Sequence, residues 1–227
     1  DSIALQFEKE GLIKKEDLYK YTGCCAGKIT ANKKLDYFKF ESLEINPFQN
    51  MLEGYFFPDT YFFPKNTNTE EIIKVVLNNF NEKIKNDEQL KLNIKKTGRG
   101  FYEVLIMASI LEKEAINYED KRMIADILWR RIQKKMPLQV DASLLYITGR
   151  NTFNLTKTDL MVKSPYNTYR YPGLPLTPIA NPGINSIRAA ADPSPNKFWY
   201  YLSDKYNVLY YSETYEEHMV NFDKYLR

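Results

Sequence analysis

Apolar residues recur with helical spacing in three segments of the chain, and these segments predict its main helices. The first is 69–84, where acidic residues open the segment and face the positive end of the helix dipole. The second is 101–116, and the third is 118–135, which ends in basic residues before Pro137. The lysine-rich stretch 93–100 between the first two helices is predicted to be a solvated connector. Much of the core should therefore be helical.

Shorter patterns flank these helices. The first 45 or so residues favour short helices, and the aromatic stretch 47–64 favours extended chain with a turn at Pro58, where we place a candidate hinge. Near the C-terminus, 184–193 predicts a short helix, and 197–212 predicts a hairpin of two strands followed by a last capped helix. Helices with a few short strands indicate an α+β fold, a mixed helical domain with short strands.

The helix at 101–116 has two acids near its end, Glu112 and Glu114, that the helical angle separates. At about 100° per residue, Glu112 falls in the middle of the apolar stripe, whereas Glu114 falls on the outer face with Lys113. A carboxylate on the inner face is costly if it stays unpaired. Glu112 is therefore either a general acid in a cleft or a structural acid paired with an arginine or a backbone amide, and periodicity alone leaves both open. The stripe consists of Phe101, Val104, Leu105, Ala108, Leu111 and Ala115.

The composition excludes several kinds of partner and of catalytic site. The charges nearly balance, with 32 basic against 29 acidic residues, so charge gives no reason to expect nucleic acid or a membrane surface as a partner. The two cysteines are adjacent, Cys24 and Cys25, which fits neither a disulfide framework nor a zinc site. The single histidine is His218, and no serine-hydrolase, zinc-protease or phosphate-loop motif occurs. These exclusions favour acid–base chemistry on a carboxylate.

The segment 164–183 is unlike the rest of the chain, because it holds five of the eleven prolines and three tyrosines. This density of proline predicts a rigid and irregular loop. A long preorganised loop with aromatic and polar groups is typical of a binding site, although it could also simply cover the edge of a core.

Four motifs occur in order from about residue 50 to the end of the chain: "LEGYFFPDTYFF" (52–63), "ASILEKEA" (108–115), "LQVDASLLY" (138–146) and the segment from "SPYNTYRYPG" to "IRAAADPS" (164–194). Together they resemble the MltG (YceG-like) family of endolytic murein transglycosylases. The resemblance implies an enzyme that cuts nascent peptidoglycan between N-acetylmuramic acid and N-acetylglucosamine and leaves 1,6-anhydro ends, without a metal or cofactor.

The resemblance places the catalytic glutamate on Glu112, the acid that the helical angle also selects. Glu112 would first protonate the glycosidic oxygen and then, as carboxylate, take the proton of the C6 hydroxyl, so that the sugar supplies its own nucleophile. The segment from Tyr166 to Tyr169 would line the cleft near Glu112. The residues expected to contact the substrate are Tyr166, Asn167, Tyr169, Gln139, Asp141 and Asn181.

The resemblance also implies how the protein is organised. Residues 1–48 would form a partial LysM-like helical module, and residues 49–227 the YceG-like catalytic domain. Because the chain begins at Asp1 and has no long apolar run, we expect an excised fragment or mature form whose anchor in the inner (cytoplasmic) membrane lies upstream. The catalytic domain would then lie in the periplasm, with peptidoglycan glycan strands as substrate and cell-wall synthases as candidate partners.

Three other interpretations fit parts of the sequence. A lysozyme-like hydrolase would use Asp141 or Asp59 as a second carboxylate beside Glu112. A non-catalytic, glycan-binding scaffold of cell-wall synthesis would bind sugar through the 164–183 loop and keep Glu112 as a structural acid. A periplasmic structural domain would have satisfied buried polar groups and no glycan ligand.

Overall fold

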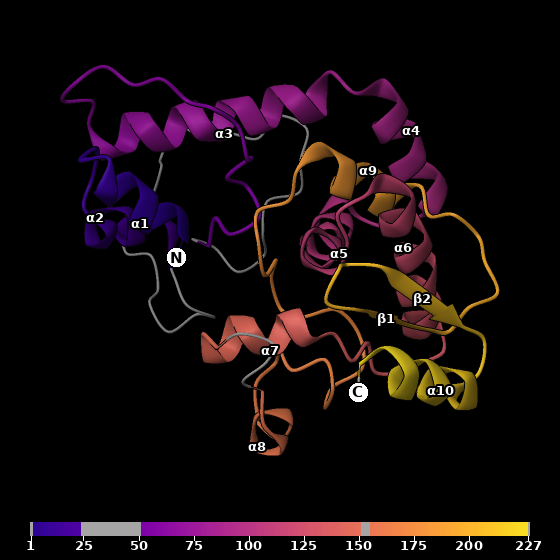
Figure 1. Ribbon diagram of the computed structural model, residues 1–227. Coiled ribbons are helices and arrows are strands. Elements are labelled where there is room, and N and C mark those ends of the chain that lie inside the picture. The colour runs from indigo at the N-terminus through magenta and orange to yellow at the C-terminus, as the bar shows by residue number, and fades with distance from the viewer. Residues whose placement is uncertain (1, 24–50, 151–154, 227) are drawn as a thin grey trace.

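The computed structural model describes residues 2–23, 51–150 and 155–226. Within these residues the fold consists of ten helices and one two-stranded sheet, so the predicted α+β class is confirmed (Figure 1). None of the helices in this part of the chain combines the length and the apolar content that a membrane span requires. In chain order the elements are α1 (Ser2–Lys9), α2 (Lys15–Thr22), α3 (Thr69–Lys85), α4 (Glu88–Thr97), α5 (Phe101–Glu114), α6 (Tyr118–Gln133), α7 (Asp141–Thr148), α8 (Lys157–Leu160), α9 (Ile184–Ala191), β1 (Tyr200–Ser203), β2 (Leu209–Ser212) and α10 (Tyr215–Tyr225).

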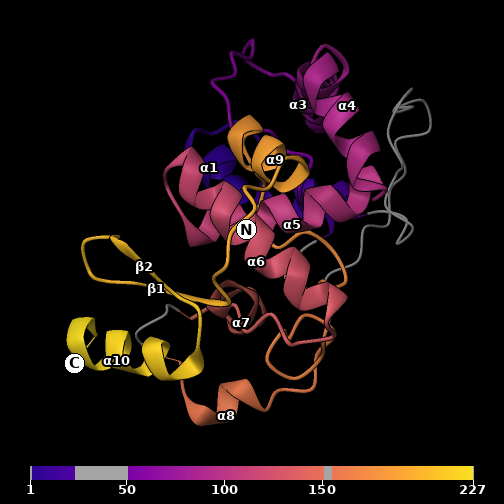
Figure 2. The ribbon, with the colours of Figure 1, turned by 90° about the vertical axis from the view of Figure 1, so that its right-hand side faces the viewer.

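Helix α5 forms the centre of the molecule. From Phe101 to Leu111 every residue except Glu103 is buried, because α6, α7 and α9 all pack against it (Figures 1 and 2). A helix that is apolar on nearly all sides is expected at such a position. The end of α5, where the two acids lie, therefore meets other elements on more than one side.

Helix α3 begins and packs as its sequence predicts. The Asn68 side chain accepts a hydrogen bond from the backbone N–H of Glu71 at 3.0 Å, and the Glu71 carboxylate accepts one from the backbone N–H of Asn68, which is a capping box. The apolar face of the helix is buried against the core, as expected of an amphipathic helix.

The predicted solvated connector at 93–100 is wrong over most of its length, because 93–97 belongs to α4. The Asp87 carboxylate caps this helix by accepting a hydrogen bond from the Leu90 N–H at 2.9 Å, and Gly98 ends it in a left-handed conformation. Lys95 and Lys96 lie on its exposed side. The lysine run is thus one face of a short helix rather than a linker.

The C-terminal elements follow the prediction. Strands β1 and β2 pair antiparallel, with Tyr200 opposite Ser212 and Ser203 opposite Leu209. The Thr214 hydroxyl caps α10 by accepting a hydrogen bond from the Glu217 N–H at 3.2 Å, and α10 packs on this hairpin.

The N-terminal helices α1 and α2 share the main core. Ala4, Leu18 and Tyr19 are buried in the same hydrophobic cluster as α5 and α9. Helices α1 and α2 alone do not show a LysM-like module. The remainder of the proposed 1–48 module lies mostly outside the described residues, so the domain boundary at residue 48 stays a prediction.

The aromatic stretch that follows forms no strand over residues 51–64, and its turn lies at Glu53 and Gly54 rather than at the predicted Pro58. Tyr55 packs edge-on against Phe80 with ring centroids 5.2 Å apart. The candidate hinge at Pro58 also stays a prediction.

Candidate active site

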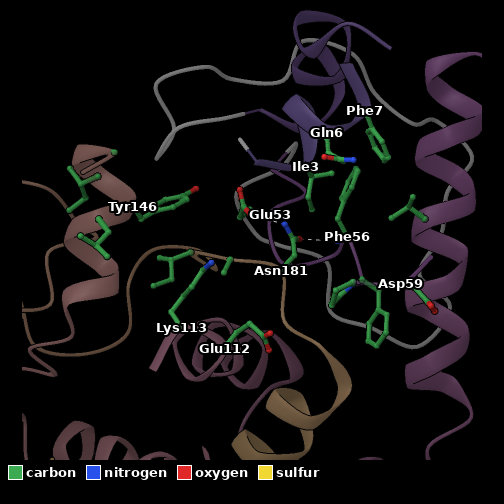
Figure 3. Close-up of a pocket in the computed structure, with 18 of the residues that line it drawn as sticks. Ile3, Gln6, Phe7, Glu53, Phe56, Asp59, Glu112, Lys113, Tyr146 and Asn181 are labelled. Carbon is green, nitrogen blue, oxygen red and sulfur yellow. Dashed lines mark hydrogen bonds between the residues drawn. The ribbon is translucent and has the colours of Figure 1, made fainter. Parts of the chain in front are cut away.

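A cavity of about 670 Å³ lies between α1, α5 and α7. Its walls come from six parts of the chain: α1, the 53–61 segment, Val76 of α3, α5, α7 with Gly149, and the 179–181 segment. A cavity of this size, lined by aromatic side chains and a few polar groups, is typical of a ligand site. The labelled side chains in Figure 3 are Ile3, Gln6, Phe7, Glu53, Phe56, Asp59, Glu112, Lys113, Tyr146 and Asn181.

Glu112 lies in the wall of this cavity, near the end of α5, with 30% of its side chain exposed (Figure 3). Three groups surround its Oε2 atom: Ser186 Oγ at 2.5 Å, the Gly183 N–H at 3.2 Å and Lys121 Nζ at 3.3 Å. Among the described residues, none donates a hydrogen bond to Oε1. One carboxylate oxygen is therefore anchored, and the other is available to a ligand in the cavity.

Sequence reasoning missed Lys121 and Ser186. Lys121 stands in the first turn of α6, three residues before the buried Ile124 and four before the buried Ala125. This spacing places the lysine on the inner face of the helix, which is unusual for a charged residue and could have identified it. Ser186 stands in the first turn of α9, and nothing local distinguishes it from a capping serine.

The prediction that Glu114 lies on the outer face with Lys113 is wrong. Its carboxylate is partly buried and accepts a hydrogen bond from the Tyr201 hydroxyl at 2.8 Å. Burial is the main cause that raises the pKa of Glu114 to about 7; the Tyr201 hydroxyl opposes the shift, and the nearby Asp141 adds to it. The helical angle is correct, but the β1–β2 hairpin covers the face that the angle assigns to solvent.

The structure places Tyr166 and Asn167 inside the loop, away from the walls of the cavity. The Tyr166 hydroxyl shares a hydrogen bond with Thr177 Oγ1 at 3.0 Å. The Asn167 amide donates to the carbonyl oxygens of Leu160 and Val162 at 3.0 and 2.9 Å. Both side chains therefore fix the path of the loop, and the expectation that they line the cleft beside Glu112 does not match this cavity.

Tyr169 and Asp141 contact each other rather than Glu112. The Tyr169 hydroxyl donates to Asp141 Oδ1 at 2.5 Å, and burial together with this carboxylate raises the pKa of Tyr169. Gln139 has a left-handed backbone, with φ of 55°, and an exposed side chain, while its N–H donates to the Thr168 carbonyl. None of the three lines the cavity, and their contact with substrate stays a prediction.

Asn181 does line the cavity, and it ties the 53–56 turn to the loop before α9. Its Oδ1 atom accepts hydrogen bonds from the N–H groups of Gly54 and Phe56 at 2.8 and 2.9 Å, and its Nδ2 atom donates to Glu53 Oε1 at 2.9 Å. Burial raises the pKa of Glu53, against the opposing effects of Lys113 and Asn181. Glu53 is thus a second acid of the cavity that sequence reasoning missed, although it stands in the "LEGYFF" motif.

The other two candidate acids differ in position. Asp59 lines the cavity with 38% of its side chain exposed. Hydrogen bonds from Asn79 and from the Thr60 N–H, together with Lys83, lower the pKa of Asp59. Asp141 lies outside the cavity.

The chain as a whole is similar to known proteins. The family model described as the YceG-like family matches residues 1–224 of the chain. The chain belongs to the YceG-like family. A solved structure of this family, the 2.6 Å crystal structure of the putative yceG-like protein lmo1499 from Listeria monocytogenes, is similar with a TM-score of 0.76 and 31% identity, and the similarity covers 95% of this chain and 70% of that one.

Two curated relatives of this YceG-like chain carry the name endolytic murein transglycosylase. The protein of Bacillus subtilis (strain 168) is 38% identical over 176 residues, which is 77% of this chain and 48% of the relative. The protein of Streptococcus pneumoniae serotype 2 (strain D39 / NCTC 7466) is 31% identical over 173 residues, 74% of this chain and 31% of the relative. The chain therefore spans about half, or less, of the length of these relatives.

Proposed function

We propose that this YceG-like chain is the catalytic part of an endolytic peptidoglycan lytic transglycosylase that cleaves between N-acetylmuramic acid and N-acetylglucosamine. The observation that carries the proposal is the Glu112 carboxylate in the wall of a large cavity, held through one oxygen by three donors. A positioned carboxyl with one free oxygen suits proton transfer to and from a bound sugar. The names of the two curated relatives support the same reaction class.

In the proposed reaction one carboxyl performs two proton transfers. Glu112 first donates a proton to the glycosidic oxygen while the bond from C1 of the muramic acid residue to that oxygen breaks. The resulting carboxylate then takes the proton of the C6 hydroxyl as O6 bonds to C1, which forms the 1,6-anhydro ring and restores the protonated acid. No water is consumed, and a positioned acid–base group of this kind contributes on the order of 10²–10⁴-fold to the rate.

The acids that line the cavity also favour one alternative function, glycan hydrolysis. A hydrolase of the lysozyme type needs a second carboxylate across the scissile bond, and Glu53 shares the cavity with Glu112, whereas Asp141 does not. If the protein hydrolyses glycan, Glu53 is therefore the acid to suspect, together with Asp59.

Product analysis separates the two reactions. We expect mass spectrometry of glycan strands digested by the parent protein to show 1,6-anhydro ends, which are one water lighter than reducing ends. Glu112→Gln should lower the rate on the order of 10²–10⁴-fold. Glu53→Gln is the matched comparison, because it removes the other cavity acid and should leave the products anhydro. Reducing ends alone would identify a hydrolase. A folded Glu112→Gln protein with the parental rate would show that Glu112 is not the acid, and a parent protein that binds glycan without cutting it would indicate a scaffold.

The wider setting is part of the same proposal. We place the catalytic domain, residues 49–227, outside the cytoplasmic membrane and held there by an anchor upstream of this chain, with residues 1–48 as a partial LysM-like module. Nascent glycan strands are then the substrate, and cell-wall synthases are the proposed partners.

A further inference from the structure

The three groups that hold Glu112 come from two other helices. Lys121 belongs to the first turn of α6, while Gly183 and Ser186 stand at the N-terminus of α9. Both helices pack against α5, whose C-terminal end carries Glu112 (Figure 2). The position of the carboxylate therefore depends on how three helices meet.

The hydrogen bonds among these side chains have a fixed direction. Lys121 Nζ lies 2.7 Å from Ser186 Oγ, and Ser186 Oγ lies 2.5 Å from Glu112 Oε2. An ammonium group has only donors, so the serine oxygen must accept from Lys121. The single hydroxyl hydrogen of Ser186 is then directed to Glu112. The charge of Lys121 thus sets the orientation of the hydroxyl that holds the carboxylate.

Lys121 and Ser186 both lie in the buried interior, where placing a polar side chain costs free energy. Lys121 is 6% exposed and Ser186 is 0% exposed. Within the described part of the chain, Glu112 is the only acid that forms an ion pair with Lys121. Replacing a buried pair of this kind with apolar residues is often neutral or stabilising, so stability alone gives a weak reason for its presence.

We propose that Lys121 and Ser186 are positioning residues, which hold Oε2 of Glu112 so that Oε1 faces the cavity for both proton transfers. The proposal rests on the proposed function of Glu112. Neither residue lines the cavity, so neither should contact the sugar. Their removal should therefore lower kcat and leave KM close to the parental value.

Steady-state kinetics on purified, uncrosslinked glycan strands tests this. Ser186→Ala removes the shortest contact to Oε2, and Lys121→Met removes the cation. We expect each variant to lose roughly 10- to 10²-fold in kcat, because a misplacement of about 1 Å can cost 10²-fold. Ser186→Thr keeps the hydroxyl and Lys121→Arg keeps the charge, and both should recover part of the loss. Lys91→Met, which removes an exposed lysine of α4 paired with Glu88, is the matched control and should keep the parental kcat.

A crystal structure of Ser186→Ala gives a measurement that does not depend on turnover. We expect the Glu112 carboxyl to adopt a second orientation or to rotate away from its parental position. A parental kcat in both Ser186→Ala and Lys121→Met, or an unchanged carboxyl in the crystal, would overturn the positioning role. Reducing ends from the parent protein would instead contradict the transglycosylase reaction, and the loss of kcat in the variants would still support positioning.

Discussion

Two carboxyl groups at the end of α5 lie in different surroundings, although only one residue separates them. Glu112 meets a lysine, a hydroxyl and a backbone N–H at the wall of the cavity. Glu114 meets Tyr201 and lies close enough to Asp141 for their charges to interact. The first environment supplies positive charge and donors, whereas the second supplies one donor and a like charge.

The environment of Glu114 predicts a stability that depends on pH. Its pKa is about 7 in the folded protein and lies near the ordinary value of about 4.3 in the unfolded chain. The folded state binds this proton more tightly, so stability is greatest below the unfolded pKa and is lost as pH rises through 7. We expect the free energy of unfolding of the parent to fall, relative to that of Glu114→Gln, by roughly 2 kcal/mol between about pH 5 and pH 8.

Urea unfolding of both proteins at the two pH values measures this difference. Glu88→Gln, on the exposed side of α4, is the control and should follow the parent at both pH values. If Glu114→Gln also follows the parent, the carboxyl of Glu114 does not titrate in this range.

Periodicity could predict the direction of Glu112 but not the cover over Glu114. The angle between positions on a helix is a local property, so the inward side chain follows from the apolar residues one and two turns before it. Tyr201 is 87 residues away in the sequence, and no local pattern places it over α5. The roles of Lys121 and Ser186 could not be predicted for the same reason. Each contacts Glu112 only because α6 and α9 pack against α5.

At the scale of elements, the 53–56 turn and the loop before α9 depend on a close backbone contact. Gly54 has a φ of 95°, and a Cβ atom on it would lie 2.7 Å from both Cβ and Cγ of Pro178. Such distances do not occur between real side chains, and a proline ring cannot rotate away. The absence of a side chain at Gly54 therefore lets Asn181 reach the two backbone N–H groups of the turn.

Gly54→Ala should be markedly more destabilising than a glycine substitution without this contact. Gly98→Ala is the matched variant, because Gly98 also has a positive φ, of 67°, but a Cβ atom there would meet nothing within 4 Å. We expect Gly98→Ala to cost about 1 kcal/mol, from backbone strain alone. Gly54→Ala should cost roughly 2–4 kcal/mol, because overpacking adds to the strain. Equal unfolding midpoints in urea would show that the turn and Pro178 separate easily.

Elements with local signals were predictable, and elements without them were not. Helix α3 has a capping box, and α5 and α6 have long apolar stripes, so their ranges follow closely from the sequence. Helix α7 begins at Asp141 without a side-chain cap and extends only to Thr148, so it has neither a capping signal nor the length over which a helical period can be recognised. Its place in the cavity wall comes from packing against α5.

At the scale of the whole molecule, the cavity is lined by residues from both sides of the proposed domain boundary at residue 48. Ile3, Gln6 and Phe7 of α1 line it together with Glu112 of α5, and Phe7 also packs edge-on against Phe63 with ring centroids 6.3 Å apart. Figure 3 shows Gln6 and Phe7 on the opposite side of the cavity from Tyr146 of α7, with Glu53 and Asn181 between them. A strand of sugars bound at Glu112 would therefore have a wall from α1 on one side.

This arrangement predicts that α1 contributes to substrate binding but not to the chemical step. Phe7→Ala removes an aromatic wall and Gln6→Ala removes a polar group, so each should raise KM by roughly threefold to tenfold, equivalent to about 1 kcal/mol of binding, with kcat unchanged. Leu5→Ala is the matched control, because Leu5 lies on the same helix, is 48% exposed and does not line the cavity.

The comparison of KM and kcat among these three variants decides whether α1 belongs to the substrate site. A change in KM for Phe7→Ala and Gln6→Ala, but not for Leu5→Ala, would mean that substrate touches α1 and that the site extends across the boundary at residue 48. Parental KM values for all three would mean that the glycan leaves the cavity on the side of α7 and that α1 only covers the core. Because Phe7 also packs on Phe63, the unfolding midpoint of Phe7→Ala must be measured alongside, so that a loss of stability is not mistaken for a loss of binding.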